Sequence, residues 1–280
     1  MTTSTTPPPI ADCHVHIFDP DRFPYRNDAA RRPARHETAP VDLLMAVLDA
    51  AGVSHALLVT PTTGYGPDNS SVIDAIARYP GRLRGIAVVE SDVADRELKA
   101  LKAAGFAGVR VDLLARGTRN NLSDGWNLAA RLRDHGMILQ IQTAGDLLDD
   151  VADRLMAEAG LVVIDHMGRP DPTLGLGQRG FRCLLRMAER PDAAVKLSGP
   201  FRFSTGPFPY DEADPYALAV LSAFGPERCV WGSDWPFVGI DHRMDYGPAL
   251  AALDRWVPGP EDRRLILWET PRRLFGFGRS

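Results

Sequence analysis

Apolar and polar positions alternate in blocks along the whole chain. Eight short apolar runs are rich in Leu and in β-branched residues, and most of them are apolar on both faces. This pattern is typical of parallel strands that are buried beneath helices. We therefore predict eight strands, at Ile10–Phe18, His55–Thr60, Leu83–Val89, Gly108–Leu113, Met137–Gln142, Leu161–Asp165, Ala194–Ser198 and Cys229–Ser233.

Between these runs, apolar residues recur with the 3.6-residue spacing of a helix that is buried on one face. Several of these segments end at a Gly, which closes a helix because it adopts the left-handed conformation without strain. The closing glycines are Gly52, Gly105, Gly136 and Gly160. The predicted helices are Val41–Ala51, Ser71–Tyr79, Ala94–Ala104, Ser123–His135, Asp146–Ala159, Gln178–Glu189, Tyr216–Phe224 and Met244–Trp256.

Strand and helix alternate eight times, which predicts an α/β fold, a (β/α)8 TIM barrel, as a single distorted domain over residues 10–280. A doubly wound open sheet is the alternative, and it usually begins with a glycine-rich turn. The first turn here is Phe18-Asp19-Pro20-Asp21, which lacks that signature. The connection from Asp19 to Pro40 is long for a compact domain, and such loops are usually lids or binding loops.

Composition and charge narrow the possible partners and cellular environment. The 280 residues carry a formal net charge of −4, which argues against nucleic acid as a partner. Cys13, Cys183 and Cys229 form no C-x-x-C pair, which favours a reducing, cytoplasmic environment over a disulfide framework. Residues 1–9 are rich in Thr and Pro and lack signal-peptide features, so we expect a short disordered tail. No apolar run is long enough to span a membrane, and the sequence leaves the oligomeric state open.

Polar residues gather where the predicted strands end. The first example is the pair His14 and His16 on the first strand. Strand alternation places both imidazoles on one face and Cys13, Val15 and Ile17 on the other. In a TIM barrel, chemistry sits at this carboxyl end of the strands. The other strand-end residues are Arg110, Asp112, Gln140, Gln142, His166, Lys196, Ser198 and Asp234, with Arg116, Arg169 and Arg202 a few residues beyond.

Several of these residues have a purely structural alternative. Asp234 suits a turn cap as well as a catalytic carboxylate, and Asp165 suits a turn better than a ligand role. Arg110 lies inside an apolar strand and needs an anionic partner, for which Asp112 on the same face is the structural candidate. Gln140 and Gln142 suit polar filling, with substrate contact as the alternative. Single arginines on loops are usually solvated, but four around one barrel end indicate an anion-binding cluster.

With these residues placed, the chain resembles the amidohydrolase superfamily, and within it the amidohydrolase-2 group of lactone hydrolases. It is most similar there to the 2-pyrone-4,6-dicarboxylate lactonase-like hydrolases. The matching motifs run through nearly the whole chain in order. They are Asp12-Cys13-His14-Val15-His16-Ile17-Phe18-Asp19-Pro20, Tyr65-Gly66-Pro67-Asp68-Asn69, Gly108-Val109-Arg110, Asp165-His166-Met167-Gly168-Arg169-Pro170, Lys196-Leu197-Ser198-Gly199, Gly232-Ser233-Asp234-Trp235-Pro236, and Trp268-Glu269-Thr270-Pro271 with Leu274-Phe275-Gly276.

The resemblance implies a hydrolase that opens a small carboxylated lactone by attack of water on the ester carbonyl. Asp234 would then accept the proton of water, and three histidines, His14, His16 and His166, would polarise the carbonyl. The substrate-binding residues that it implies are Arg110, Arg116, Arg169, Arg202, Gln142 and Asn69. The chain departs from the group at two positions, with Phe237 in place of an Asn and Gln142 near the place of a Tyr.

The same residues raise the question of a metal. His14, His16 and Asp234 could hold one Zn²⁺ with an open position for water. Arg110 cannot ligate and the fifth strand offers only Gln140 and Gln142, which argues against a two-metal site. The arginine-rich site favours no cofactor, with one divalent zinc ion as the alternative. A metal-dependent decarboxylase of an unsaturated or aromatic acid ranks second as a function, and a non-catalytic binding barrel third.

Overall fold

The computed structural model describes residues 8–114 and 122–278. Eight parallel strands form one sheet in the order β1 to β8, so that each strand pairs with its neighbour in sequence. The predicted TIM barrel is confirmed. The strands are β1 Ala11–Val15, β2 His55–Val59, β3 Leu83–Ala87, β4 Phe106–Asp112, β5 Ile138–Gln142, β6 Val162–Ile164, β7 Ala193–Ser198 and β8 Cys229–Gly232.

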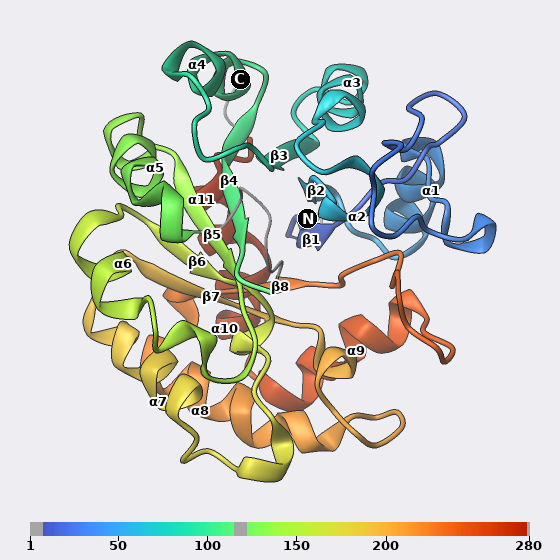
Figure 1. Cartoon of the computed structure of the whole chain (residues 1–280). Coiled ribbons are helices and arrows are strands. Elements are labelled where there is room, and N and C mark those ends of the chain that lie inside the picture. The colour runs from blue at the N-terminus through green and yellow to red at the C-terminus, as the bar shows by residue number, and fades with distance from the viewer. Residues whose placement is uncertain (1–7, 115–121, 279–280) are drawn as a thin grey trace, which may run out of the picture.

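Helices surround the strands on the outside, as Figure 1 shows. The predicted segment at residues 146–159 is divided into a short 3-10 turn, η2 Gly145–Leu148, and α6 Ala152–Glu158. Two further helices at the carboxyl terminus, α10 and α11, were not among the predicted elements. The α-helices are α1 Val41–Ala50, α2 Thr62–Tyr65, α3 Ser70–Arg78, α4 Asp95–Ala103, α5 Leu122–Asp134, α6, α7 Arg179–Arg186, α8 Asp214–Phe224, α9 Tyr246–Trp256, α10 Pro260–Arg264 and α11 Thr270–Phe275.

The ring closes between β8 and β1 through the main chain and one buried carboxylate. The amide of His16 donates to Trp235 O, and the amide of Asp234 donates to His14 O, both at 2.8 Å. Asp12 Oδ1 accepts the amides of Ser233 at 2.9 Å and of His14 at 3.0 Å. The Asp12 carboxylate therefore takes the place of ladder hydrogen bonds at the seam of the barrel.

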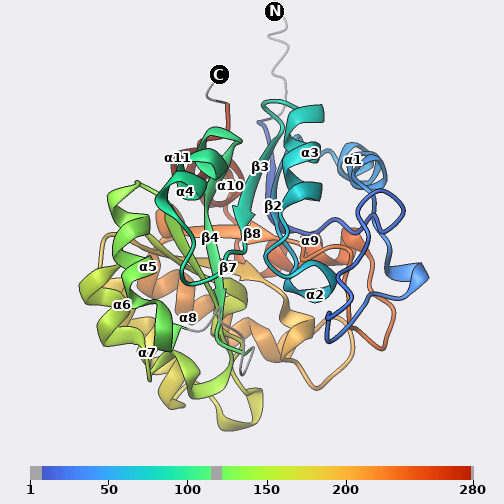
Figure 2. The same cartoon turned by 45° about the horizontal axis from the view of Figure 1, so that its top comes forward.

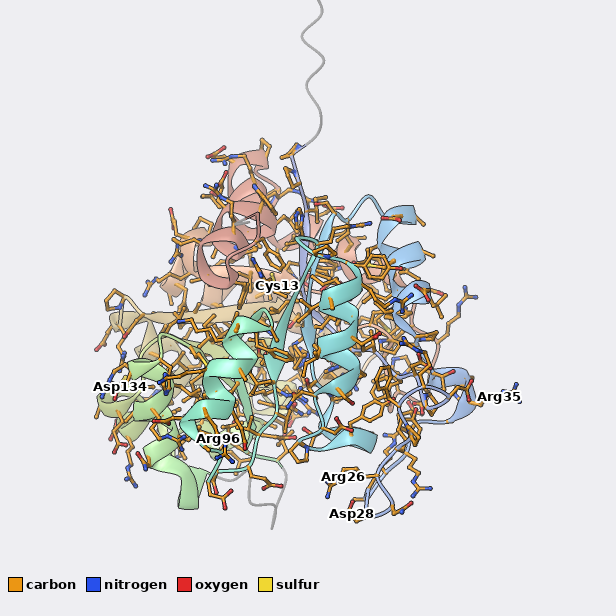
Figure 3. All side chains as sticks on the ribbon, turned by 90° about the horizontal axis from the view of Figure 1, so that it is seen from above. Cys13, Arg26, Asp28, Arg35, Arg96 and Asp134 are labelled. Atoms are coloured by element: carbon orange, nitrogen blue, oxygen red, sulfur yellow. The ribbon has the colours of Figure 1, made fainter. Side chains whose placement is uncertain are left out.

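The first strand contains an irregularity that the sequence did not reveal. The pairing of β1 with β2 shifts between Asp12 and Val15, as in a β-bulge. His14 and His16 still share one face, as predicted. Cys13 does not join Val15 on the other face: it packs with Ala11 in the apolar cluster that fills the barrel, and Figure 3 shows it well inside the molecule.

Two apolar clusters account for the core. The larger one lies between the strands and the surrounding helices, and the smaller one draws residues from seven strands together with Phe275 and Phe277. These two aromatic side chains close the amino-terminal end of the barrel, where Figure 2 places α11 beside the start of β1. The site at the opposite end is thus built on a rigid, filled interior.

The long connection at residues 19–40 is held to two neighbouring elements. Arg22 makes two hydrogen bonds with the carboxylate of Asp74 on α3, at 2.9 and 3.0 Å. Glu37, in the 3-10 turn η1 Arg35–Glu37, accepts the amide of Gly239 at 2.8 Å. The connection therefore lies against the loop that follows β8. Of the helices in the part of the chain that the structure describes, none has the length and apolar character to cross a membrane.

Candidate active site

A polar cavity of about 120 Å³ lies at the carboxyl ends of the strands. Its charged lining consists of four arginines and two carboxylates, so that positive charges exceed negative ones by two when the histidines are neutral. The lining residues are His16, Phe18, Arg31, Pro61, Thr62, Thr63, Arg110, Asp112, Gln142, His166, Arg169, Arg202, Asp234 and Val238. The structure therefore brings most of the predicted site residues together.

Two glycines make room for the histidines. A side chain on Gly232, the last residue of β8, would meet the Cβ of His14 at 2.6 Å. A side chain on Gly199 would meet Nδ1 of His166 at 2.7 Å, and Gly199 also has a φ of +59°. Each glycine is therefore required by a close approach to a site residue. This explains why Gly follows both Lys-Leu-Ser and Trp.

The backbone is strained at the same place. His166 and Arg169 both have left-handed backbone conformations, with φ of 49° and 46°, in and next to the 3-10 turn η3 Asp165–Gly168. Asp234 has a φ of 64°. Such conformations are costly for residues other than Gly, and they gather at functional sites where the surroundings fix them.

His14, His16 and Asp234 converge on one point. Nε2 of His14 lies 3.3 Å from Nε2 of His16. Oδ1 of Asp234 lies 3.4 Å from Nε2 of His16 and 3.7 Å from Nε2 of His14. Burial lowers the pKa of both histidines, and nearby cations lower it further. Both imidazoles are therefore neutral at neutral pH.

Asp234 is a buried carboxylate with a strong counter-ion. Burial raises its pKa, but Arg202 and His166 outweigh that effect and hold the pKa well below its ordinary value. Nε of Arg202 donates to Asp234 Oδ2 at 2.5 Å, and Nη1 of Arg202 donates to the carbonyl of Val238 at 2.8 Å. Asp234 is therefore ionised, and the guanidinium group of Arg202 is oriented by its contacts at Nε and at Nη1.

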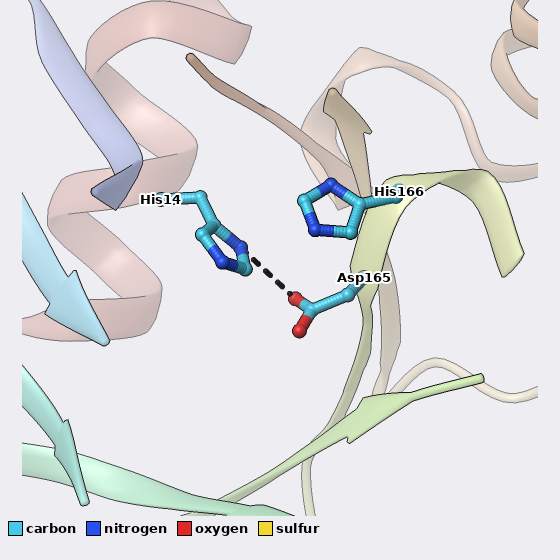
Figure 4. A group of neighbouring side chains, drawn as sticks. All are labelled: His14, Asp165 and His166. Atoms are coloured by element: carbon cyan, nitrogen blue, oxygen red, sulfur yellow. Dashed lines mark ion pairs between the residues drawn. The ribbon is translucent and has the colours of Figure 1, made fainter. Parts of the chain in front are cut away.

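A second set of buried charged residues, Asp165 and Lys196, lies next to His14. Asp165 was expected to serve a turn, and that expectation is wrong: its carboxylate is fully buried, with Oδ1 at 3.4 Å from His14 Nδ1 and at 3.2 Å from Lys196 Nζ. Figure 4 shows the carboxylate turned toward His14, with His166 alongside. Burial raises the pKa of Asp165, but the ammonium group of Lys196 outweighs it and keeps the carboxylate ionised.

His166 faces the cavity, as predicted. Its Nδ1 lies 2.8 Å from Oγ of Ser198, and its Nε2 lies 3.8 Å from Oδ2 of Asp234. Burial lowers the pKa of His166 to about 4, against the attraction of Asp234. Neutral His166 can therefore accept a hydrogen bond from Ser198 through Nδ1 and present an Nε2–H donor to a bound molecule.

Arg110 and Arg169 have no carboxylate partner among the described residues. Arg110 donates to Gln142 Oε1 at 2.9 Å and to Thr60 O at 3.1 Å, and the structural alternative, a pairing with Asp112, is not found. Nε of both arginines is buried and has no hydrogen-bond partner in that part of the chain. Arg116 lies outside the described residues.

Sequence reasoning missed Arg31, which lines the cavity from the connection 19–40 and pairs with Glu37 at 3.3 Å. The length of that connection was the available signal, but it does not say which residue turns inward. Asn69 is not among the residues that line the cavity. Its side chain bonds instead to the main chain of Val88, with Oδ1 accepting at 3.0 Å and Nδ2 donating at 2.8 Å.

The spacing of His14, His16 and Asp234 suits one divalent metal. A tetrahedral zinc ion bound to N and O ligands at about 2.0–2.1 Å separates its ligand atoms by about 3.4 Å, close to the 3.3, 3.4 and 3.7 Å found here. A second group, His14, Asp165 and His166, also has its ligand atoms within 4.8 Å of one another. In that group the ammonium of Lys196 already contacts His14 and Asp165.

Comparison with known proteins gives the family. The family model described as amidohydrolase (Amidohydro_2) matches residues 11–277. The chain belongs to the amidohydrolase family. The resemblance inferred from the strand-end motifs is thereby confirmed, and the family match makes the chain an enzyme rather than a non-catalytic barrel.

Two curated relatives of this amidohydrolase are hydrolases by name. The 4-sulfomuconolactone hydrolase of Rhizobium radiobacter is 33% identical over 276 residues, which covers 95% of this chain and 89% of that protein. The 2-pyrone-4,6-dicarboxylate hydrolase of Comamonas testosteroni is 32% identical over 281 residues, covering 96% and 90%. A crystal structure from Pseudomonas putida, described as a 2-pyrone-4,6-dicarboxylic acid hydrolase, has a TM-score of 0.84 at 28% identity and covers 97% of this amidohydrolase and 99% of that chain.

Proposed function

We propose that this enzyme hydrolyses the ester bond of a small lactone that carries at least one carboxylate. The observation that carries the proposal is a pair of arginines at the cavity, buried Arg110 and half-buried Arg169, whose guanidinium groups have no carboxylate partner among the described residues. A buried cation is costly unless an anion meets it. A planar carboxylate of the substrate would supply that anion through paired N–H···O hydrogen bonds.

The two curated relatives support the same class of substrate. The name of one denotes a lactone with a sulfonate group, and the name of the other denotes a cyclic ester with two carboxylates. In this chain Arg110 lines the cavity and is positioned by hydrogen bonds from Nη1 to Gln142 and from Nη2 to Thr60 O and Thr62 Oγ1. Its buried Nε has no partner among the described residues. Arg116 and Asn69 stay predictions as substrate contacts.

Asp234 is the proposed proton acceptor for the attacking water. Its ionised carboxylate lies at the base of the cavity, beside His16 and His166. Ion pairing with Arg202 keeps its pKa low and thereby weakens it as a base. A substrate carboxylate that shares Arg202 would loosen this pairing and strengthen the base when the substrate is bound.

The developing oxyanion needs hydrogen-bond donors and positive charge. Nε2–H of neutral His166 provides a donor in the cavity, and Arg202 and Arg169 provide positive charge close to it. His14, His16 and Asp234 would hold a divalent metal if one binds, and the metal would then act as a Lewis acid and lower the pKa of a bound water. Because the lining is rich in arginine, we propose that His166, Arg169 and Arg202 stabilise the oxyanion sufficiently without a metal.

A substrate panel tests the proposal. The purified enzyme is incubated with 2-pyrone-4,6-dicarboxylate, a monocarboxylated muconolactone and a neutral aldonolactone, and ring opening is followed by ultraviolet absorbance and proton release. We expect kcat/KM for the carboxylated lactones to exceed that for the neutral lactone at least tenfold, as one charge-assisted hydrogen bond of about 1.5–3 kcal/mol requires. Equal values for all three would refute it, and release of carbon dioxide would identify a decarboxylase instead.

The variant Asp234→Asn is the matched control for the chemistry. It preserves the shape of the side chain and removes the proton acceptor. We expect turnover to be lost while the equilibrium binding of the open-chain product, measured by calorimetry, persists. Retention of substantial turnover would show that another group activates water.

A further inference from the structure

Lys196, on β7, is a fully buried ammonium group with three polar neighbours. Its Nζ lies 2.7 Å from Gln140 Oε1, 3.2 Å from Asp165 Oδ1 and 3.3 Å from His14 Nδ1. The orientation of Gln140 is fixed, because its Nε2 donates to the other oxygen of Asp165 at 2.9 Å. The ion pair with Asp165 favours the charged form of Lys196.

The surroundings of Lys196 decide where His14 carries its proton. An ammonium group has three N–H donors and no acceptor, and a buried donor needs a partner. Two of the neighbours, Gln140 Oε1 and His14 Nδ1, lie in hydrogen-bonding geometry, which requires that His14 Nδ1 accepts, whereas Asp165 Oδ1 contacts the ammonium group as an ion pair without an aligned hydrogen bond. Asp165 Oδ1 is the competing partner of His14 Nδ1, but at 3.4 Å this contact is not aligned as a hydrogen bond. Neutral His14 therefore carries its proton on Nε2.

The protonation of His16 is fixed from the other side. Its Nδ1 lies 2.7 Å from the carbonyl oxygen of Val59, which can only accept, so His16 carries its proton on Nδ1 and has a lone pair on Nε2. The Nε2–H of His14 points at that lone pair across 3.3 Å. Each group thus donates to the next: Lys196 to His14, His14 to His16, and His16 to the carbonyl oxygen of Val59.

We propose that Lys196 is a positioning residue that holds His14 in its Nε2–H tautomer and thereby opposes metal binding by His14, His16 and Asp234. A metal needs the lone pair of His14 at Nε2, where this tautomer has a proton. To bind one, His14 must move that proton to Nδ1, and Lys196 then loses a buried acceptor. The inference concerns the protein alone and does not depend on which lactone the enzyme opens.

The variant Lys196→Met tests the inference through metal affinity. Met has a similar length and no donor, so His14 Nδ1 becomes free to donate to Asp165, and Nε2 becomes a ligand. We expect the affinity for Zn²⁺, measured by competition with a chromophoric chelator, to rise about 10- to 100-fold, the usual range for changes in the partners of a ligand. Co²⁺ should give tetrahedral visible absorption bands in Lys196→Met at concentrations at which the wild type shows none. The control Lys102→Met, at an exposed lysine on α4, should leave both readouts unchanged.

A second measurement on the wild type needs no variant to fold. Nitrogen-15 chemical shifts of the histidine rings separate protonated from unprotonated ring nitrogens, with His14 assigned by comparison with His14→Gln. We expect an unprotonated Nδ1 and a protonated Nε2 in His14 of the metal-free wild type. A protonated Nδ1 in His14, or a Zn²⁺ affinity of folded Lys196→Met equal to that of the wild type, would overturn the inference.

Discussion

Replacing Arg202 with Met is expected to destabilise the fold far more than the same replacement at Arg110. Arg202 pairs with Asp234 at 2.5 Å, with exposed side-chain fractions of only 17% and 2%. Removing one member of a buried pair leaves an uncompensated charge, which typically costs about 3–5 kcal/mol. Arg110 is also buried but has no carboxylate partner among the described residues, so Arg110→Met leaves no uncompensated charge. It leaves the neutral acceptors Gln142 Oε1 and Thr60 O without this donor and should cost about 1–2 kcal/mol.

The loss in Arg202→Met should depend on pH. In the wild type the pKa of Asp234 in the folded state lies below the ordinary value of 3.8, so its ionisation contributes stability that is present above that pH and is lost as the pH falls through the folded-state pKa. The variant lacks the cation that lowers this pKa. The difference in unfolding free energy between wild type and Arg202→Met should therefore be full at pH 7 and shrink toward acid pH.

Urea unfolding followed by far-ultraviolet circular dichroism, at a series of pH values from 7 to 3, measures this difference, with Arg110→Met as the matched control. In activity assays, the acid limb of kcat/KM should move to higher pH in Arg202→Met and stay in place in Arg110→Met, although both variants should show a raised KM. Equal destabilisation of the two variants, with no pH dependence of their difference, would refute the pairing of Arg202 with Asp234 as the dominant interaction at this site.

Three further predictions follow from single contacts. Burial raises the pKa of Asp12 from 3.8 to about 6. The folded state should therefore lose about 3 kcal/mol of stability relative to the unfolded state as the pH rises from below 3.8 to above 6. Asp12→Asn keeps an acceptor for the amides of His14 and Ser233 and should remove this pH dependence of the unfolding free energy in urea titrations; an unchanged pH dependence would contradict the assignment. Gly232→Ala should lower stability by about 1–3 kcal/mol and also lower kcat, because the added methyl group displaces His14; a variant with wild-type stability would show that the strand ends can relax. Arg31→Met should raise KM for a dicarboxylated lactone more than for a monocarboxylated one, and an equal change for both substrates would place Arg31 outside the substrate contacts.

The sequence by itself determined the architecture. Eight apolar runs separated by helical periodicity allow few solutions other than a closed parallel barrel, because each strand must be covered on both faces. The same alternation placed His14 beside His16, and the fold rule that chemistry lies at the carboxyl ends of strands brought Asp234 and Arg202 to the same cavity. These inferences succeeded because they depend on local periodicity and on chain order.

Only the tertiary structure decided which polar residues act on one another. Strand alternation separates Asp165 from His166, but a left-handed backbone in η3 turns both side chains toward His14. The position of Cys13 depended on a bulge that local pattern does not show. The partners of Lys196 come from β1, β5 and the end of β6, which are far apart along the chain. Burial, ion pairing and proton position at this site are properties of the assembled strand ends, because each depends on groups that meet only when the barrel closes.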